Sequence, residues 1–200
     1  MKQFVSIFCS SIFFLACNSN YTVGKKKGYF RIDFPEKKYQ AFDLPGYPYT
    51  FQYPVYAVIK KDSTFFDDKA GDWWINIDFP QFSGRIYVSY KDIGGGRNQF
   101  DSLVNDAFRM AYSKHADIST GIGEKRIQTP NGVGGIYFNL GGNTATANQF
   151  FLTDTGRHFL RGALYFDAAP NEDSLSIVNN FLREDLEHLI NTLEWKAPGP

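Results

Sequence analysis

Three histidines are the side chains best suited to acid–base or metal chemistry, and they are His115, His158 and His188. Metal and catalytic histidines recur at short spacings, such as two His four residues apart on one helix face. No two histidines in this chain are that close. We therefore expect a solvated or structural role for each, and we expect no metal and no cofactor.

Motifs for nucleophilic catalysis and for phosphate binding are also absent from the sequence. No Gly-X-Ser-X-Gly segment is present. Glycines 94–96 precede a predicted helix, whose N-terminus could bind an anion. The lysine and the Ser or Thr that complete a phosphate loop are missing there. We interpret this segment as a flexible connection.

Carboxylates give no clearer sign of catalysis. General acid–base chemistry needs two groups that converge on one substrate. The closest pairs in sequence are Asp33 with Glu36 and Asp67 with Asp68. Their spacing does not place either pair in a cleft, and 67–69 has the composition of a turn. We predict that the protein is not an enzyme.

The first 17 residues have the form of a bacterial lipoprotein signal peptide. Lys2 precedes an apolar stretch of about 13 residues, which is shorter than the roughly 20 residues of a membrane-spanning helix. The stretch ends in FLAC and resembles a lipobox, in which the cysteine is lipidated, although Phe14 stands where leucine is usual. An ordinary cleaved signal with an incidental cysteine is the alternative. We predict a signal peptide over 1–16 and lipidation at Cys17.

Such an anchor predicts where the protein resides. A diacylglyceryl group and an acyl chain such as palmitate supply three hydrocarbon tails, and each buried methylene contributes about 0.8 kcal/mol, so the anchoring is permanent. Residues 17–27 would be the lipidated cysteine and a polar tether. No acidic residue directly follows Cys17, so the familiar inner-membrane retention signal is absent. We expect an anchor facing the periplasm, in the outer membrane rather than the inner one.

Charge and aromatic content limit the partners. Lysine plus arginine equals aspartate plus glutamate at 21 each, so we expect no nucleic-acid partner. The cysteines are Cys9 and Cys17, which leaves no disulfide for the folded part. Aromatic residues make up 18% of the chain. A β-rich core explains them most simply, and an exposed aromatic surface is the alternative.

Residues 147–166 are expected to lie at the centre of a β-sheet. Two segments of alternating polarity flank the turn sequence DTG at 154–156, as in a β-hairpin. Large apolar groups occupy both faces of the second segment, which is typical of a central strand. The same alternation predicts further strands at 28–35, 49–53, 56–60, 72–79, 85–91, 118–128 and 134–140.

Two helices complete the predicted fold. The first spans about 98–114 with Asn98 as its N-cap, and the second follows 170–173 with a leucine-rich stripe. The order of strands, helix, strands and helix predicts a single α+β domain over 28–197, a twisted antiparallel sheet with two main helices packed on it. This layout resembles the PsbP/Mog1-type fold, and a fold alone does not give function.

Five segments carry a resemblance to a known family. They are GYFRIDFPEKKY (28–39), PYTFQYP (48–54), WWINIDFPQFSGRIYVSYK (73–91), NQFFLTDTGRHFLRGALYFDAAPNEDSL (148–175) and EDLEHLINTLEW (184–195). They cover most of the mature chain and are similar to GldD, a gliding-motility lipoprotein of Bacteroidetes. Related sequences often have a cysteine where this chain has Tyr47, which puts any role of a thiol there in doubt.

The resemblance implies a membrane-anchored accessory or scaffold of the gliding machinery, associated with type IX secretion. It implies partners among the other gliding lipoproteins, no catalytic activity and no small-molecule substrate. Cys17 is the one functional residue that can be carried over. This implied role is our first hypothesis.

Two other hypotheses stay open. Exposed aromatics could bind glycan or peptidoglycan. The candidates for that surface are Tyr47, Tyr49, Tyr53 and Tyr56. A hydrolase would need His115 or His158 within reach of a serine and a carboxylate.

A partner-binding surface is predicted on the second strand of the central hairpin. A sheet with one open face would expose Arg161 together with Phe159 and Tyr165, with Arg157 nearby. An arginine flanked by aromatic rings is typical of a binding hot spot. A salt bridge from Arg161 to Asp167 or Glu172 is the alternative.

Overall fold

The structure is a computed structural model that describes residues 31–62, 71–94 and 96–196. The chain divides into two units, 1–33 and 34–200. In the first unit, Arg31 forms an ion pair with Asp33 at 2.9 Å. The predicted signal peptide, the lipidation at Cys17 and the tether all lie outside the described residues.

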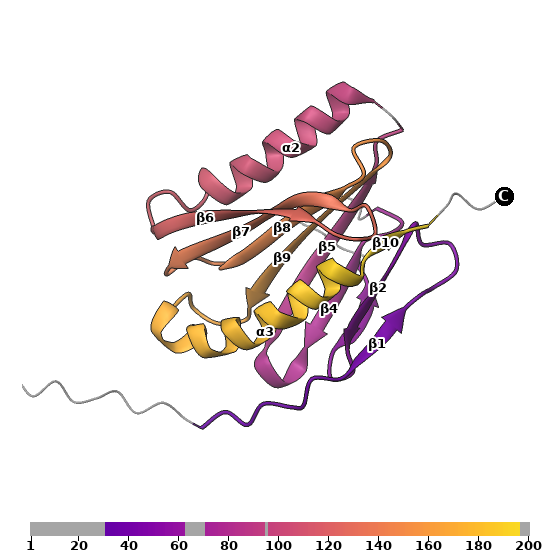
Figure 1. The fold of residues 1–200 in the computed structure, drawn as a ribbon. Coiled ribbons are helices and arrows are strands. Elements are labelled where there is room, and N and C mark those ends of the chain that lie inside the picture. Colours follow the sequence, from indigo (N-terminus) through magenta and orange to yellow (C-terminus); the bar gives the residue numbers. More distant parts are fainter. Residues whose placement is uncertain (1–30, 63–70, 95, 197–200) are drawn as a thin grey trace, which may run out of the picture. The chain divides into compact units, whose positions relative to one another are not determined.

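A seven-stranded antiparallel sheet forms the centre of the second unit (Figure 1). Its spatial order is β3 (Val58–Lys61), β4 (Ile75–Phe79), β5 (Gly84–Asp92), β9 (His158–Phe166), β8 (Asn148–Thr153), β7 (Gly134–Gly142) and β6 (Ser119–Gln128). The 3-10 turn η2 (Pro80–Phe82) joins β4 to β5. Strand β9 has three strands on either side, which confirms its predicted central position.

A second, three-stranded sheet contains β1 (Tyr39–Phe42), β2 (Tyr49–Pro54) and β10 (Glu194–Trp195), with β2 in the middle. Strand β1 was not predicted. The strand expected at 28–35 is wrong over its described part, because residues 31–38 contain no strand. Pro35 has no N–H to donate to a ladder, and the ring of Phe34 stacks on Phe181 at 4.4 Å instead.

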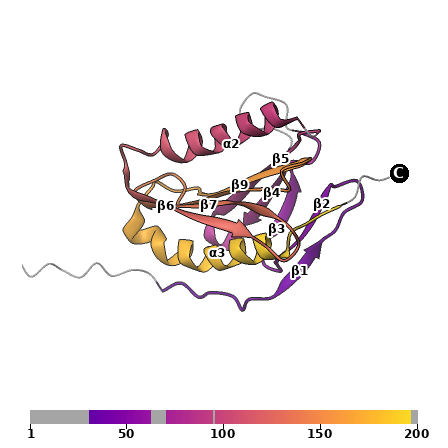
Figure 2. The same cartoon turned by 45° about the horizontal axis from the view of Figure 1, so that its top comes forward.

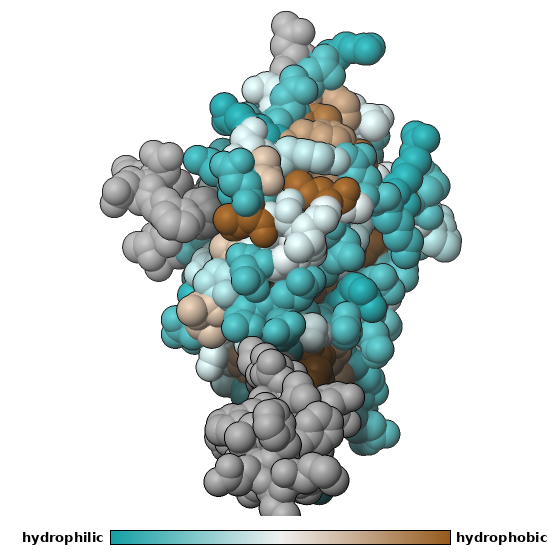
Figure 3. Space-filling model, turned by 90° about the vertical axis from the view of Figure 1, so that its left-hand side faces the viewer, coloured by the Kyte–Doolittle hydropathy of each residue, from teal (hydrophilic) through white to brown (hydrophobic). Residues whose placement is uncertain are grey.

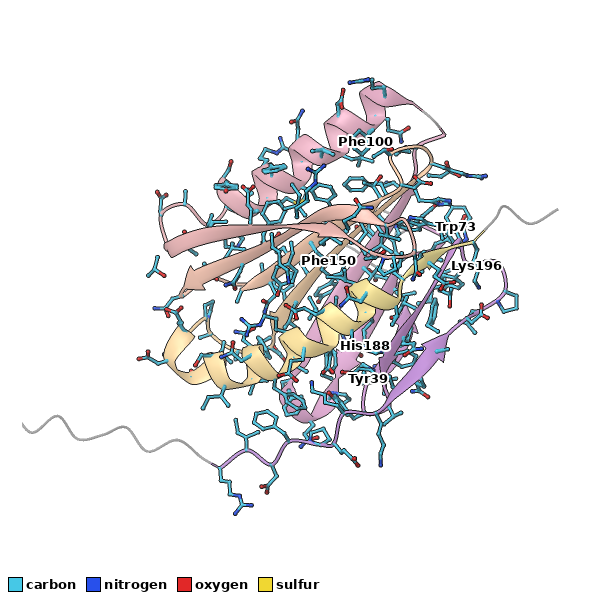
Figure 4. All side chains as sticks on the ribbon, in the orientation of Figure 1. Tyr39, Trp73, Phe100, Phe150, His188 and Lys196 are labelled. Carbon is cyan, nitrogen blue, oxygen red and sulfur yellow. The ribbon has the colours of Figure 1, made fainter. Side chains whose placement is uncertain are left out.

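Two helices cover the two faces of the large sheet (Figures 1 and 2). Helix α2 (Arg97–Tyr112) lies on one face and α3 (Glu172–Thr192) on the other. Because successive side chains of a strand point to opposite faces, β8 contributes Phe150 to the core under α3 and Phe151 to the core under α2. Phe150 and Phe100 of α2 mark the two cores in Figure 4. The predicted α+β class is confirmed.

The helix N-termini differ in how they are capped. Asn171 accepts a hydrogen bond from the Ser174 N–H at 3.1 Å and caps α3, close to the predicted start. Gly96 is the N-cap of α2, without a side-chain hydrogen bond. The predicted N-cap at Asn98 is therefore wrong, because the observed N-cap lies two residues earlier.

The segment that leads into β1 is tied to α3 at the buried carboxylate of Asp185. Lys37 Nζ lies 2.8 Å from Oδ1, and the Tyr39 hydroxyl donates to the same oxygen at 3.0 Å. The Tyr56 hydroxyl donates to Oδ2 at 2.5 Å. The Tyr39 ring also stacks on His188 with centroids 3.6 Å apart (Figure 4). These contacts fix the N-terminal segment of this unit against its last helix.

Candidate functional site

Helix α2 packs on only part of its face of the sheet. The apolar side chains beneath it come from β6, β7, β8 and the beginning of β9, together with Ile93 just after β5. Beside it, the side chains of β3, β4, β5 and the rest of β9 surround an open hollow of about 700 Å³, a volume in the range of ligand sites. We call this the sheet hollow, and it is lined by Lys60, Asp62, Trp74, Asp78, Phe79, Pro80, Ser83, Gly84, Arg85, Tyr87, Val88, Ser89, Arg161, Ala163, Tyr165, Phe166 and Asp167.

Small side chains in the middle of two strands create this space. In the ladder between β5 and β9, Ser89 is opposite Arg161 and Tyr87 is opposite Ala163. Directly opposite residues lie about 5 Å apart on the same face. The short side chains of Ser89 and Ala163 therefore leave room between the longer ones of Tyr87, Arg161 and Tyr165.

Charges at the β4 side of the hollow neutralise one another. Asp78 accepts hydrogen bonds from Lys60, at 2.8 Å, and from Arg85. Burial of Asp78 acts to raise the pKa of its carboxyl, but the hydrogen bonds from Arg85 and Lys60 outweigh it and hold the pKa below its ordinary value. The hydrogen bond to Asp78 likewise raises the pKa of Arg85. The three groups are therefore paired across β3, β4 and β5.

Arg161, on β9, has a different environment. Its Nη2 donates to Oε1 of Gln149, a neutral and fully buried side chain, at 3.0 Å. Burial lowers the pKa of Arg161, though a guanidinium stays protonated in proteins. Among the described residues no carboxylate forms an ion pair with it, including those at 167–172. A positive charge therefore faces the hollow without an anionic partner from the described part of the chain.

Two tyrosine rings lie next to this charge. Tyr87 and Tyr165 meet edge to face, with centroids 5.6 Å apart. The Arg85 guanidinium lies 5.5 Å from the Tyr87 ring. Aromatic rings beside an arginine give a surface that can bury apolar area and pair with an anion at once. Geometrically, the hollow is suited to binding.

Comparison with known protein families identifies the chain. A family model described as gliding motility lipoprotein GldD matches residues 19–195. The chain belongs to the GldD family. It is a lipoprotein component of the gliding motility machinery, anchored to a membrane of the cell envelope.

Other comparisons add little beyond the family. A search of curated proteins gives no match. The solution structure of cyanobacterial PsbP (CyanoP) from Synechocystis sp. PCC 6803 is similar to this GldD-family chain, with 9% identity and a TM-score of 0.47. The similarity covers 81% of this chain and 95% of that one.

The structure separates the four residues predicted to bind a partner. Arg161 and Tyr165 both line the sheet hollow. Phe159 is 3% exposed and stacks on Phe151 beneath α2, so the prediction that it is exposed beside them is wrong. Arg157 lies in the turn before β9 and pairs with Asp92 at 3.0 Å, outside the hollow.

Residues of β3, β4 and β5 were missed as site residues. Lys60, Asp78, Arg85, Tyr87 and Ser89 line the hollow but were assigned only to strands. Their signal was present in β5, where polar and tyrosine side chains at 85, 87 and 89 alternate with the buried Ile86 and Val88. That alternation indicates a face that is not fully covered.

The four tyrosines proposed as a glycan-binding surface belong instead to the core around the small sheet. Tyr49 is 0% exposed, and its hydroxyl donates to the Trp73 carbonyl at 2.5 Å. The other three are partly buried and packed against the same core, and they are Tyr47, Tyr53 and Tyr56. The predicted exposure is therefore wrong for Tyr49, and the other three rings are exposed only in part.

Each histidine makes a structural contact. His158 is buried, with Nδ1 2.6 Å from the Tyr90 hydroxyl, and its ring stacks on Trp195 at 4.9 Å. His115 Nδ1 lies 3.2 Å from the Ala111 carbonyl oxygen, and His188 hydrogen-bonds the Gln52 amide. Over residues 31–62, 71–94 and 96–196, no three His, Cys, Asp or Glu side chains are grouped to hold a metal ion.

The remaining surface is mainly hydrophilic on the side seen in Figure 3, where hydrophobic residues gather only in small patches. The most exposed large hydrophobic residues include Ile118 at 50% and Ile177 at 47%. None of the helices in the described part of the chain is both long and apolar enough to cross a membrane. The sheet hollow is therefore the strongest candidate site.

Proposed function

We propose that this chain is a non-enzymatic interaction module of the gliding machinery that holds a protein partner at the sheet hollow. The observation that carries the proposal is the Arg161 guanidinium, which faces the hollow beside Tyr165 and, within residues 31–62, 71–94 and 96–196, has only a neutral amide as its partner. A charge left without a counter-ion in a wall of a cavity is a strong recognition element.

The side chains around the hollow support a role in binding rather than in catalysis. Ser83 and Ser89 line it, but a serine nucleophile needs a base within hydrogen-bond reach. The three histidines are held elsewhere by Tyr90, Ala111 and Gln52. Of the three carboxylates that line the hollow, at Asp62, Asp78 and Asp167, that of Asp78 is occupied by two cations. These pairings favour a surface that recognises a partner without transforming it.

The proposed function includes a lipid anchor that attaches the folded domain to the outer membrane. Residues 1–16 are the signal peptide, Cys17 carries the lipid, residues 17–27 are the tether, and the folded domain spans 28–197. The lipid lies in the outer membrane and faces the periplasm, because no acidic retention residue follows Cys17. There the hollow contacts other lipoproteins of the machinery that gliding shares with type IX secretion.

The anchoring claim is tested by Cys17→Ala, with Cys9→Ala as the matched control. Both proteins should fold, because neither cysteine lies in the folded domain. Fractionation of the envelope should place the Cys17→Ala protein in the soluble periplasmic fraction, and cells carrying it should not glide. The Cys9→Ala protein should stay in the outer membrane and support gliding. Membrane retention of the Cys17→Ala protein would overturn the anchor.

A further inference from the structure

The walls of the sheet hollow provide a fixed guanidinium with no counter-ion among the residues that the structure describes. Gln149 is 1% exposed, and its Oε1 accepts from Arg161 Nη2 at 3.0 Å. A neutral acceptor orients the guanidinium plane but leaves its charge in place. A guanidinium carries five donors in a planar fork, and Arg161 makes no other side-chain hydrogen bond to the described part of the chain, so its other N–H groups can bind a ligand. An anion completes this arrangement.

The shape of the guanidinium selects among anions. A planar fork pairs with a carboxylate through two parallel hydrogen bonds, and such pairs are stronger than neutral hydrogen bonds. Leaving a buried cation unpaired is costly. Burial already disfavours the charge on Arg161, as its lowered pKa indicates. A carboxylate bound there would therefore relieve that cost while gaining a charge-assisted contact.

The surroundings of Arg161 favour a carboxylate carried by a polypeptide. Tyr87 and Tyr165 offer an edge-to-face pair of rings, with the small side chain of Ala163 between them and Arg161. The hollow follows β5 from Arg85, opposite Tyr165, to Ser89, opposite Arg161. These five residues span four steps of the strand, or about 13 Å. An extended peptide of four or five residues has that length, and its apolar side chains can pack on the rings.

We infer that the sheet hollow binds an acidic peptide segment of a protein partner, with an aspartate or glutamate carboxylate paired to Arg161 and the flanking residues packed on Tyr87 and Tyr165. This inference rests on the proposed function, because it takes the partner to be a protein.

The experiment uses the full-length lipidated protein in detergent micelles and degenerate pentapeptide libraries with blocked termini. The libraries differ only at the central residue, which is Glu, Asp, Gln, Asn or phosphoserine. Saturation-transfer NMR should show that the Glu or Asp library binds at least about tenfold more tightly than its amide counterpart, since that factor corresponds to one good charge-assisted contact. Equal binding of acid and amide libraries would overturn the inference, as would preference for phosphoserine or for free glucuronate.

Variants connect the preference to Arg161. Arg161→Gln should remove the difference between acid and amide libraries. Arg161→Lys keeps the charge but not the planar fork, so it should retain only part of the difference between acid and amide libraries. It also serves as the folded variant if Arg161→Gln lowers the stability of the protein. Arg109→Gln is the control, because Arg109 is exposed on α2 and pairs with Asp106. A preference that survives in both Arg161 variants would overturn the assignment.

Gliding assays separate this inference from the proposed function. Loss of gliding in Arg161→Gln cells without any preference for acidic libraries would leave the interaction role standing and overturn the ligand class. Acid-selective binding together with normal gliding of Arg161→Gln cells would support the ligand class and overturn the proposed function.

Discussion

The ring of Phe150 on β8 lies directly over Gly162, its partner across the ladder on β9. A Cβ atom at position 162 would lie 2.2 Å from Cζ of that ring, which is fully buried. Only glycine allows this approach. The contact fixes the register of the central hairpin, because a shift of one residue would move the ring to the opposite face.

Replacing that glycine should destabilise the fold. Gly162→Ala inserts a methyl group where the Phe150 ring lies, and overpacking of this kind costs about 2–3 kcal/mol. Urea unfolding of the purified protein measures the loss. The control is Gly156→Ala in the turn of the same hairpin, where the nearest atom to a Cβ is 3.9 Å away. An equal effect of the two substitutions would contradict the packing argument.

Asp185 should be needed for stability to a similar extent. It is 1% exposed and is contacted by Lys37, Tyr39 and Tyr56. Asp185→Asn keeps the shape but leaves Lys37 without its counter-ion, and breaking a buried pair in this way costs about 3 kcal/mol. Glu184→Gln removes an exposed charge one residue away and should change the free energy of unfolding little. Equal stability of the two variants would show that the contacts at Asp185 contribute nothing.

The free energy of unfolding should decrease when the pH drops below the ordinary pKa of histidine, 6.5. Burial lowers the pKa of His158 from 6.5, although Asp154 opposes this, and burial lowers the pKa of His188 as well. Below about pH 6.5 the unfolded chain then binds protons that the folded chain does not, so the free energy of unfolding decreases. Above that pH the two histidines contribute no slope. Urea unfolding from about pH 7.5 to pH 5 measures the change.

The variant His158→Phe measures how much of this pH dependence comes from His158, because phenylalanine can stack on Trp195 but cannot titrate. The variant should show a shallower loss of stability between about pH 6.5 and pH 5, with the remainder due to His188. Carboxylates act in a separate window. The lowered pKa values of Asp78, Asp92 and Asp154 remove stability only as the pH falls below 3.8. An unchanged slope in the variant would rule out His158 as its source.

Most of the fold could be predicted from the sequence because apolar and polar side chains alternate clearly along most of its strands. The hairpin at β8 and β9 has apolar side chains on both faces and a clear turn signal, and it lies at the centre of the sheet. Strand β1 has only four residues, YQAF, with one buried side chain. Its pairing with β2 is supported by the contacts of Lys37 and Tyr39 with Asp185, which lies far along the chain. The sequence around β1 does not predict such long-range contacts.

The site could be predicted only in part for a different reason. Phe159 and Arg161 are two residues apart on the same face of β9. Alternation along the strand therefore predicts the same exposure for both side chains. Helix α2 ends its coverage between them, which buries Phe159 and leaves Arg161 at the hollow. Where a helix stops covering a sheet depends on its packing angle and on the loops that carry it. Alternation along a strand contains no information on either.

The most direct measurement is the gliding speed of cells that carry Arg161→Ala as their only copy, with protein level and outer-membrane fraction checked. Arg157→Ala is the comparison, since Arg157 is exposed and pairs with Asp92 outside the hollow. We predict that the Arg161 variant accumulates normally and abolishes gliding, whereas the Arg157 variant glides. Wild-type gliding with Arg161→Ala would contradict the claim that the sheet hollow is the site at which this protein serves the machinery.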